Sequence, residues 1–123
     1  MKKAILVADD EDFLRLLVKE TLTRYRVIEA RDGNEALQLA REAAPDLLIL
    51  DWMMPGRHGP AVLEALRADP ATRDLPVLMI TAKSGAAARA QLLAAGATAC
   101  LPKPFGTGQL RAIVEEILEK SER

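Results

Sequence analysis

Short apolar runs alternate along this chain with stretches of helical periodicity, and this alternation constrains the fold more than any other feature. Apolar runs of four or five residues that stop at a polar residue are typical of buried parallel strands. A helix after each strand indicates a parallel sheet with helices on both faces. The predicted strands are residues 4–8, 26–30, 47–50, 77–80 and 98–101.

Helical spacing follows each predicted strand. From Phe13 the apolar residues fall on one face as far as Tyr25, and we interpret Asp12 as the N-cap of this helix. Pro60 suits the first turn of a helix, and Gly96 suits the position just after one. The predicted helices are residues 13–25, 33–44, 60–68 and 86–95, with a last one that includes 110–118.

Right-handed crossovers leave few possible strand orders. Among doubly wound α/β folds, the flavodoxin-like order 2-1-3-4-5 suits five strands, and it puts the topological switch point between the first and third strands. The chain of 123 residues has room for one domain, and we find no linker. We therefore predict a single domain over residues 1–123, without an output domain.

The composition excludes several function classes. A net charge of −1 gives no general attraction to nucleic acid or to an anionic membrane, and aromatic residues at 3% are too few for base-stacking platforms. Cys100 is the only cysteine, which favours a reducing compartment. The apolar run after Lys3 is too short for a signal peptide, and no window approaches the length of a membrane span. These observations predict a cytoplasmic protein.

Polar residues stand where the predicted strands end. Asp9 and Asp10 follow the first strand, Asp51 the third and Thr81 the fourth, and Lys103 comes soon after the fifth. In open parallel sheets, ligands bind outside the carboxyl ends of the strands. Carboxylates this close repel one another unless a hard cation such as Mg²⁺ lies among them. We therefore expect one site for a divalent cation and a phosphoryl group.

This set of residues suits phosphoryl transfer. One carboxylate could act as a nucleophile and form an acyl phosphate, while a metal neutralises the developing charge. Lys103 supplies a mobile positive charge, and Thr81 supplies a hydroxyl donor. Taken singly, each residue has a simpler interpretation as a helix cap or a solvated loop residue. Their joint placement at the strand ends favours the interpretation as a functional site.

The chain resembles the receiver domain of two-component response regulators over essentially its whole length. The resemblance rests on the order and spacing of four segments: Asp9-Asp10, Asp51-Trp52-Met53-Met54-Pro55-Gly56, Thr81-Ala82 and Lys103-Pro104-Phe105. Because the chain ends soon after its fifth helix, it is similar to the stand-alone receivers of chemotaxis and phosphorelays.

The resemblance implies that Asp51 is the phosphoacceptor, which takes its phosphoryl group from a sensor histidine kinase or a phosphotransfer protein. Asp9, Asp10 and Asp51 would hold Mg²⁺, with the backbone carbonyl of Met53 as a further ligand. Such a domain catalyses its own phosphorylation and dephosphorylation but is a signalling module, not an enzyme.

The resemblance also implies that Thr81 and Lys103 bind the phosphoryl group, and that the Lys103–Pro104 bond is cis. Phosphorylation would then bias a two-state domain toward an active form that a downstream protein recognises. Apart from the resemblance, the small residues of the alanine-rich helix at 86–95 allow close approach by a partner, which suggests a docking or dimer surface on this helix, the fifth strand and the fifth helix; that alanine is simply the best helix former is an equally good interpretation. We expect a monomer or a weak homodimer.

The sequence departs from the family at three places. Cys100 stands three residues before Lys103, where the family usually has an aromatic ring that turns inward. A small thiol cannot swing in this way, and we interpret Cys100 as a buried space-filling residue rather than a redox sensor. His58 replaces a common acidic residue, and we interpret it as solvated. Met53 and Lys83 occupy positions that influence phosphoryl lifetime, and the apolar Met53 predicts slow self-dephosphorylation.

Two alternatives stay open at this point. One is a receiver-like interaction module that no longer responds to phosphate, which the missing aromatic at Cys100 suggests. The other is a Mg²⁺-dependent phosphatase with an aspartyl nucleophile, although no lid or substrate domain is evident in the sequence.

Overall fold

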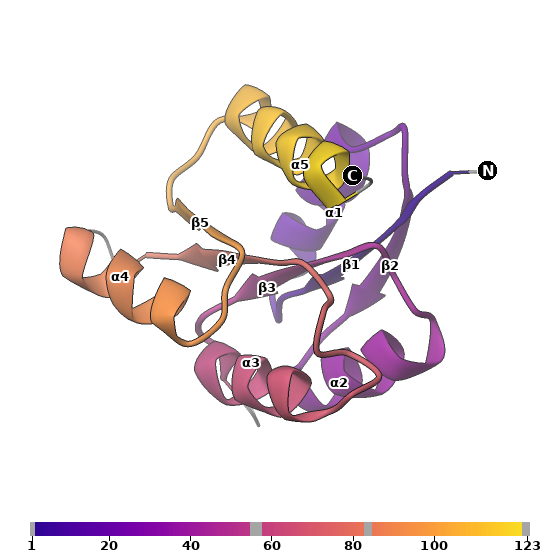
Figure 1. Ribbon diagram of the computed structural model, residues 1–123. Helices are drawn as coiled ribbons and strands as arrows, with labels where there is room; N and C mark the ends of the chain where they lie inside the picture. Colours follow the sequence, from indigo (N-terminus) through magenta and orange to yellow (C-terminus); the bar gives the residue numbers. More distant parts are fainter. Residues whose placement is uncertain (1, 55–57, 83–84, 122–123) are drawn as a thin grey trace.

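The computed structural model describes residues 2–54, 58–82 and 85–121. Its strands are β1 (Ala4–Ala8), β2 (Arg26–Ala30), β3 (Leu47–Asp51), β4 (Val77–Thr81) and β5 (Ala99–Pro102). They form one parallel sheet in the order β2-β1-β3-β4-β5 (Figure 1). The predicted order is confirmed, and β1 and β3 lie side by side at the switch point.

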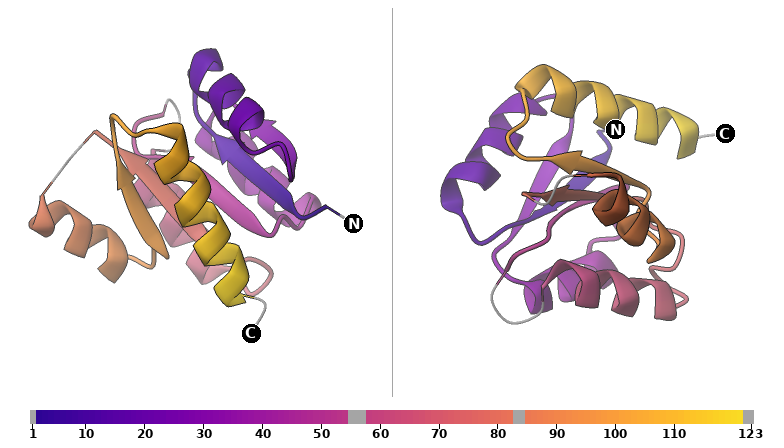
Figure 2. Two further views of the ribbon diagram at one scale, coloured as in Figure 1. Left: turned by 90° about the horizontal axis from the view of Figure 1, so that it is seen from above. Right: turned by 90° about the vertical axis from the view of Figure 1, so that its left-hand side faces the viewer.

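Helices cover both faces of this sheet. They are α1 (Asp12–Thr21), α2 (Gly33–Glu42), α3 (Gly59–Ala68), α4 (Ala86–Ala94) and α5 (Thr107–Ser121). Figures 1 and 2 show α1 and α5 on one face and α2 and α3 on the other. The helix α4 adds Leu92 to the core that α2 and α3 cover. In the described ranges, no helix combines the length and the apolar character needed to cross a membrane.

Each central strand contributes to two hydrophobic cores, because successive residues of a strand point to opposite faces. In β3, Leu48 and Leu50 join the core under α2 and α3, whereas Leu47 and Ile49 join the core under α1 and α5. All four side chains are almost fully buried. This two-sided burial explains why the strands are continuous apolar runs in the sequence.

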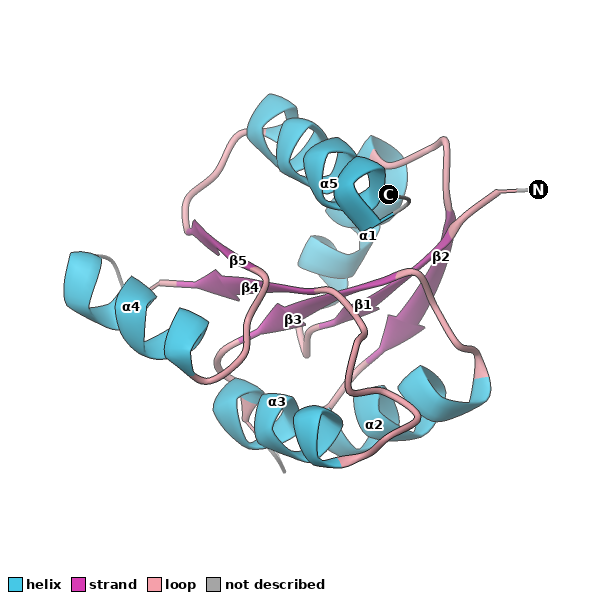
Figure 3. Cartoon of the chain, in the orientation of Figure 1, coloured by secondary structure: helices cyan, strands magenta, loops and turns pink. Residues whose placement is uncertain are grey.

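The register brings the carboxyl ends of the strands to one edge of the sheet (Figure 3). Ala8 at the end of β1 lies beside Ala30 of β2 and Leu50 of β3, and Thr81 lies beside Pro102. The loops that leave β1, β3, β4 and β5 therefore start next to one another, as the predicted site requires.

The start of α1 differs from the prediction. Glu11, not Asp12, holds the N-cap position, and it makes no side-chain capping bond. Asp12 is the first helical residue, and its carboxylate pairs with Arg15. The Asx-type bond that organises this turn comes from Asp9, whose Oδ1 accepts the Glu11 N–H at 2.7 Å. The predicted N-cap was wrong because Asp9 already fixes the turn.

Other boundaries shift by a few residues. The helix α1 ends at Thr21, and Tyr25 packs against the core from the following turn. The helix α2 ends at Glu42 because Ala44, which precedes a proline, has a φ of 45°. The last strand runs one residue later than predicted, and Gly96, with a φ of 110°, follows α4 as expected.

Candidate functional site

Carboxylates from two neighbouring strands meet at the switch point. Asp9 and Asp10 follow β1, Asp51 ends β3, and one carboxylate oxygen of each lies within 4.8 Å of the others. Asp9 is fully buried and Asp51 is 4% exposed, whereas Asp10 faces solvent. The structure thus brings together the three acidic residues that the sequence placed here, two of them shielded from bulk water.

Lys103, which directly follows β5, adds a positive charge to the same edge of the sheet. Its Nζ lies 3.4 Å from Oδ1 of Asp51, 3.9 Å from Oδ2 of Asp9 and 4.0 Å from Oε1 of Glu11. The backbone N–H of Lys103 donates to the carbonyl of Thr81 at 2.8 Å, which ties the lysine to the end of β4. The Lys103–Pro104 bond is cis, as the resemblance implied.

Asp9 is the least compensated charge of this site. Its Oδ2 is buried and has no hydrogen-bond partner among the described residues. The pKa of Asp9 is raised from 3.8 to about 7, chiefly by burial and also by the charge of Asp51, although the Glu11 amide and Lys103 act in the opposite direction. One ammonium does not balance three carboxylates. The buried, unbonded oxygen and the hard oxygen donors around it therefore fit a divalent cation.

Thr81 ends β4 and is buried at the same edge. It lines a cavity of about 290 Å³ together with Leu92, Cys100 and Pro102, under the start of α4. Burial raises the pKa of the Cys100 thiol, and the nearby Arg89 lowers it to a smaller degree. Cys100 is itself buried, which confirms its interpretation as an interior residue, and its protonated thiol is a poor nucleophile.

The family model of the response regulator receiver domain matches residues 5–115. This chain belongs to that family. The receiver is 38% identical over 123 residues to the phosphate regulon transcriptional regulatory protein PhoB of Rhizobium meliloti, which covers 98% of this chain and 54% of that protein. It is 44% identical over 119 residues to the response regulator PleD of Caulobacter vibrioides, which covers 95% of this chain and 26% of that protein.

Solved receiver structures agree with this assignment. The chemotaxis response regulator CheY4 of Vibrio cholerae superposes with a TM-score of 0.90 at 32% identity, over 95% of this chain and 99% of that chain. The receiver domain of Francisella response regulator 1452 gives a TM-score of 0.91 at 28% identity, over 97% of this chain and 98% of that chain. The chain is thus a signalling domain of two-component systems, and the predicted family and fold are confirmed.

Some predicted features of the receiver remain predictions. The side chain of Met53 is 67% exposed, and the role of its carbonyl as a metal ligand stays a prediction. His58 is exposed at the N-cap of α3 and makes no side-chain capping bond, in keeping with a solvated residue. Pro55, Gly56 and Lys83 lie outside the described residues.

Arg15, which is buried and contacts the backbone of Asp9, was not among the residues predicted from the sequence. A signal for it exists in the sequence. Arg15 falls on the buried face of α1, next to Leu14 and three residues before Val18, where a charged residue needs a partner. Asp12, three residues earlier on the same helix, is one such partner.

Proposed function

We propose that this receiver accepts a phosphoryl group on Asp51 from the phosphohistidine of a sensor histidine kinase or a phosphotransfer protein. The observation that carries the proposal is the position of Lys103, whose Nζ lies 3.4 Å from Oδ1 of the buried Asp51. A buried carboxylate with an adjacent mobile ammonium, at the edge where this fold class binds ligands, is suited to receive an anionic group.

In the proposed step, an oxygen of Asp51 attacks phosphorus and forms an acyl phosphate. The bond between phosphorus and the imidazole nitrogen breaks, and the histidine keeps the electron pair. Lys103 then offsets the charge of the phosphoryl oxygens, and the Thr81 hydroxyl donates a hydrogen bond to one of them. Phosphorylation biases the domain toward a second conformation that a target protein recognises.

We assign a Mg²⁺ site to Asp9, Asp10 and Asp51, with the backbone carbonyl of Met53 as a further ligand. The buried Oδ2 of Asp9, which lacks a hydrogen bond among the described residues, supports the assignment. When bound, Mg²⁺ supplies charge neutralisation at the phosphoryl oxygens. Asp9 and Asp10 would hold the ion, while Asp51 would be shared between the ion and the incoming phosphoryl group.

Large apolar side chains exposed on α1 and on the loop after β3 suit contact with the phosphodonor protein. Phe13 and Leu16 on α1 are 73% and 50% exposed, and Met53 is exposed on the loop after β3. Exposed large apolar side chains that gather beside a site mark an interaction surface. We therefore expect the donor to dock over α1 and this loop, in the cytoplasm.

A second surface would serve the downstream partner. The helix α4 is alanine-rich and mostly exposed, and Leu93 on it is 40% exposed. Because the cavity behind α4 is lined by Thr81, a shift of Thr81 toward a phosphoryl group would change the packing under this helix. We assign the face of α4, β5 and α5 to a target protein or, in a weak homodimer, to a second receiver.

Trp52 provides the test, since it directly follows Asp51 and is the only tryptophan. We expect Mg²⁺ to change its fluorescence, and a small-molecule phosphodonor to cause a second change that requires Mg²⁺ and is absent in Asp51→Asn. The decay of that second change reports phosphoryl lifetime, which we expect to be long because Met53 cannot orient a water. A wild-type chain that responds to neither addition would refute the proposal.

An interaction module that ignores phosphate is the weaker alternative. Its basis was the loss of an aromatic residue at Cys100, which affects readout and not phosphoryl acceptance. The position of Lys103 within 4 Å of both Asp9 and Asp51 supports phosphoryl acceptance.

A further inference from the structure

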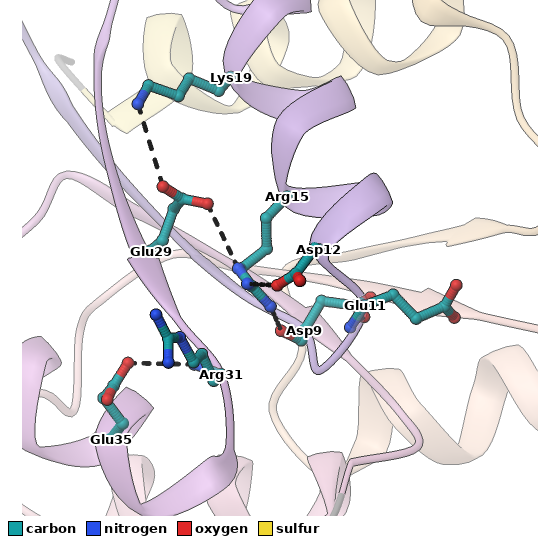
Figure 4. Close-up of polar contacts among 8 residues, drawn as sticks. All are labelled: Asp9, Glu11, Asp12, Arg15, Lys19, Glu29, Arg31 and Glu35. Atoms are coloured by element: carbon teal, nitrogen blue, oxygen red, sulfur yellow. Dashed lines mark hydrogen bonds and ion pairs between the residues drawn. The ribbon is translucent and has the colours of Figure 1, made fainter.

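Arg15 is a buried arginine whose contacts surround the backbone of Asp9. The residue is only 5% exposed. Its Nη1 donates to the backbone carbonyl of Asp9 at 2.7 Å, its Nε lies 3.3 Å from Oε1 of Glu29, and its Nη2 contacts the carboxylate of Asp12 (Figure 4). One guanidinium therefore links the end of β1, the strand β2 and the first turn of α1.

The ion pairs alone do not account for the burial of Arg15. The side chains of its two carboxylate partners, Glu29 and Asp12, are 39% and 93% exposed, so their pairs with Arg15 are partly screened by water. Burial of a guanidinium carries a desolvation cost that such pairs offset poorly. The fully buried contact is the one to the Asp9 carbonyl. This contact, and not the pairs, distinguishes Arg15 from a surface arginine.

The contact from Arg15 completes a clamp on Asp9. The N–H of Asp9 donates to the carbonyl of Ala30 at 3.1 Å, and its Oδ1 accepts the N–H of Glu11 at 2.7 Å. Because a peptide group is planar, a fixed Asp9 carbonyl also fixes the nitrogen and Cα of Asp10. The guanidinium thus helps to fix the backbone from which both neighbouring carboxylates project.

We propose that Arg15 is a positioning residue for the acidic site, which holds the Asp9–Asp10 peptide so that both carboxylates face a divalent cation. This inference rests on the proposed Mg²⁺ site and names a residue that acts on it without touching the ion. Preorganised ligands bind more tightly because less conformational freedom is lost when the ion arrives.

The direction in which the Mg²⁺ affinity changes after removal of Arg15 distinguishes a positioning role from a purely electrostatic one. By Coulomb's law, removal of a positive charge beside an acidic cluster strengthens the binding of a cation. Loss of positioning weakens it. Arg15→Met removes both the charge and the contact to Asp9, so the two explanations predict opposite changes in the dissociation constant of Mg²⁺. Arg15→Lys keeps the charge and loses the planar fork that reaches several partners at once.

Arg67 offers a matched control. Its guanidinium also donates to backbone carbonyls, those of Gly96, Thr72 and Arg73, but it lies near the end of α3, away from the carboxyl edge of the sheet. Arg67→Met therefore removes an arginine–backbone clamp of the same kind without touching the acidic site.

The experiment is a Mg²⁺ titration of the whole chain followed by Trp52 fluorescence, at a temperature where circular dichroism shows each variant folded. We expect Arg15→Met and Arg15→Lys to weaken Mg²⁺ binding at least tenfold and Arg67→Met to change it less than twofold. Unchanged or tighter binding in Arg15→Met would overturn the proposal. If Arg15→Met does not fold, the result for Arg15→Lys is the test. An unchanged Mg²⁺ dissociation constant in Arg15→Lys would then overturn the proposal.

Failure of the proposed function gives a different result. A wild-type chain and an Arg67→Met variant that both lack a Mg²⁺ response would refute the metal site and, with it, the role of Arg15. Normal binding in the wild type, with equal binding in both Arg15 variants, would refute only the role of Arg15.

Discussion

At the scale of single residues, Asp9 carries the clearest conflict between folding and function. Its carboxyl group is fully buried beside Asp51, and its pKa rises to about 7 from an ordinary value of 3.8. The folded chain therefore holds a proton that the unfolded chain releases. The wild-type protein should lose stability as the pH rises from about 4 to about 7, and the loss should be complete above that range.

Asp9→Asn removes this titration and keeps an oxygen that can accept the Glu11 N–H. In metal-free buffer near pH 8, we expect the variant to be more stable than the wild type by up to about 4 kcal/mol, because the pKa of Asp9 is raised from 3.8 to about 7 and each pKa unit corresponds to about 1.4 kcal/mol. The advantage should shrink toward about pH 4. Urea denaturation in the presence of a chelator measures the stability difference near pH 8 and its decrease toward pH 4. The control is Asp10→Asn, at an exposed position. An advantage that does not depend on pH would contradict the assignment.

Cys100 makes a second prediction at this scale. Because burial raises the pKa of its thiol and limits access, alkylation by iodoacetamide at neutral pH should be at least about 100-fold slower in the native chain than in denaturant. Intact-mass measurements on samples taken at successive times give the alkylation rate in the native chain and in denaturant. Similar rates in the two states would show that the thiol is accessible and reactive, against the interpretation as an interior residue.

At the scale of elements, the close approach of α3 to β3 depends on Gly59. A Cβ on Gly59 would lie 2.8 Å from the carbonyl oxygen of Asp51 and 2.9 Å from Cα of Trp52, both of them backbone atoms. The N–H of Gly59 also donates to the carbonyl of Trp52 at 2.8 Å. The helix thus begins directly against the strand end that carries Asp51.

We expect Gly59→Ala to destabilise the chain by about 2 kcal/mol, the typical cost of overpacking, and to weaken Mg²⁺ binding, because α3 must move away from Asp51. Gly108→Ala is the matched control: Gly108 lies in α5, and a Cβ there meets no atom within 4 Å. That change should be neutral or stabilising by up to about 1 kcal/mol. Equal stability of the two variants in chemical denaturation would contradict the packing argument.

The elements themselves were well predicted from the sequence, and their ends less so. Apolar runs at residues 47–50 and 77–80 identify β3 and β4 because those strands are buried on both faces. The start of α1 was missed because a side chain outside the helix, that of Asp9, organises the turn, while Asp12 pairs with Arg15. Which of several neighbouring acidic residues organises the start of a helix depends on contacts that periodicity does not reveal.

At the scale of the whole molecule, the site exists only when the sheet is complete, since Asp9, Asp51 and Lys103 come from the ends of three different strands. The strand order allowed this convergence to be predicted from the sequence. Helical spacing does place Arg15 on the buried face of α1. The burial of Asp9 and the contact of Arg15 with the Asp9 carbonyl could not be predicted in this way, because they depend on contacts between side chains and backbone that secondary-structure patterns do not contain.

A ligand that binds the assembled site stabilises the whole fold. At a concentration 100 times its dissociation constant, Mg²⁺ should raise the free energy of unfolding by about 2.7 kcal/mol. A chelator should reverse the gain, and Asp51→Asn should reduce it. Thermal denaturation with and without Mg²⁺ measures the effect. An equal shift in Asp51→Asn and in the wild type would place the ion elsewhere.

The most direct test of the account is the covalent state of Asp51. The chain is incubated with Mg²⁺ and a small-molecule phosphodonor, and the intact mass and the peptide that contains Asp51 are measured under acidic conditions. We expect a gain of one phosphoryl group, located on Asp51, dependent on Mg²⁺ and absent in Asp51→Asn. No mass gain in the wild type, or an equal gain in Asp51→Asn, would contradict it.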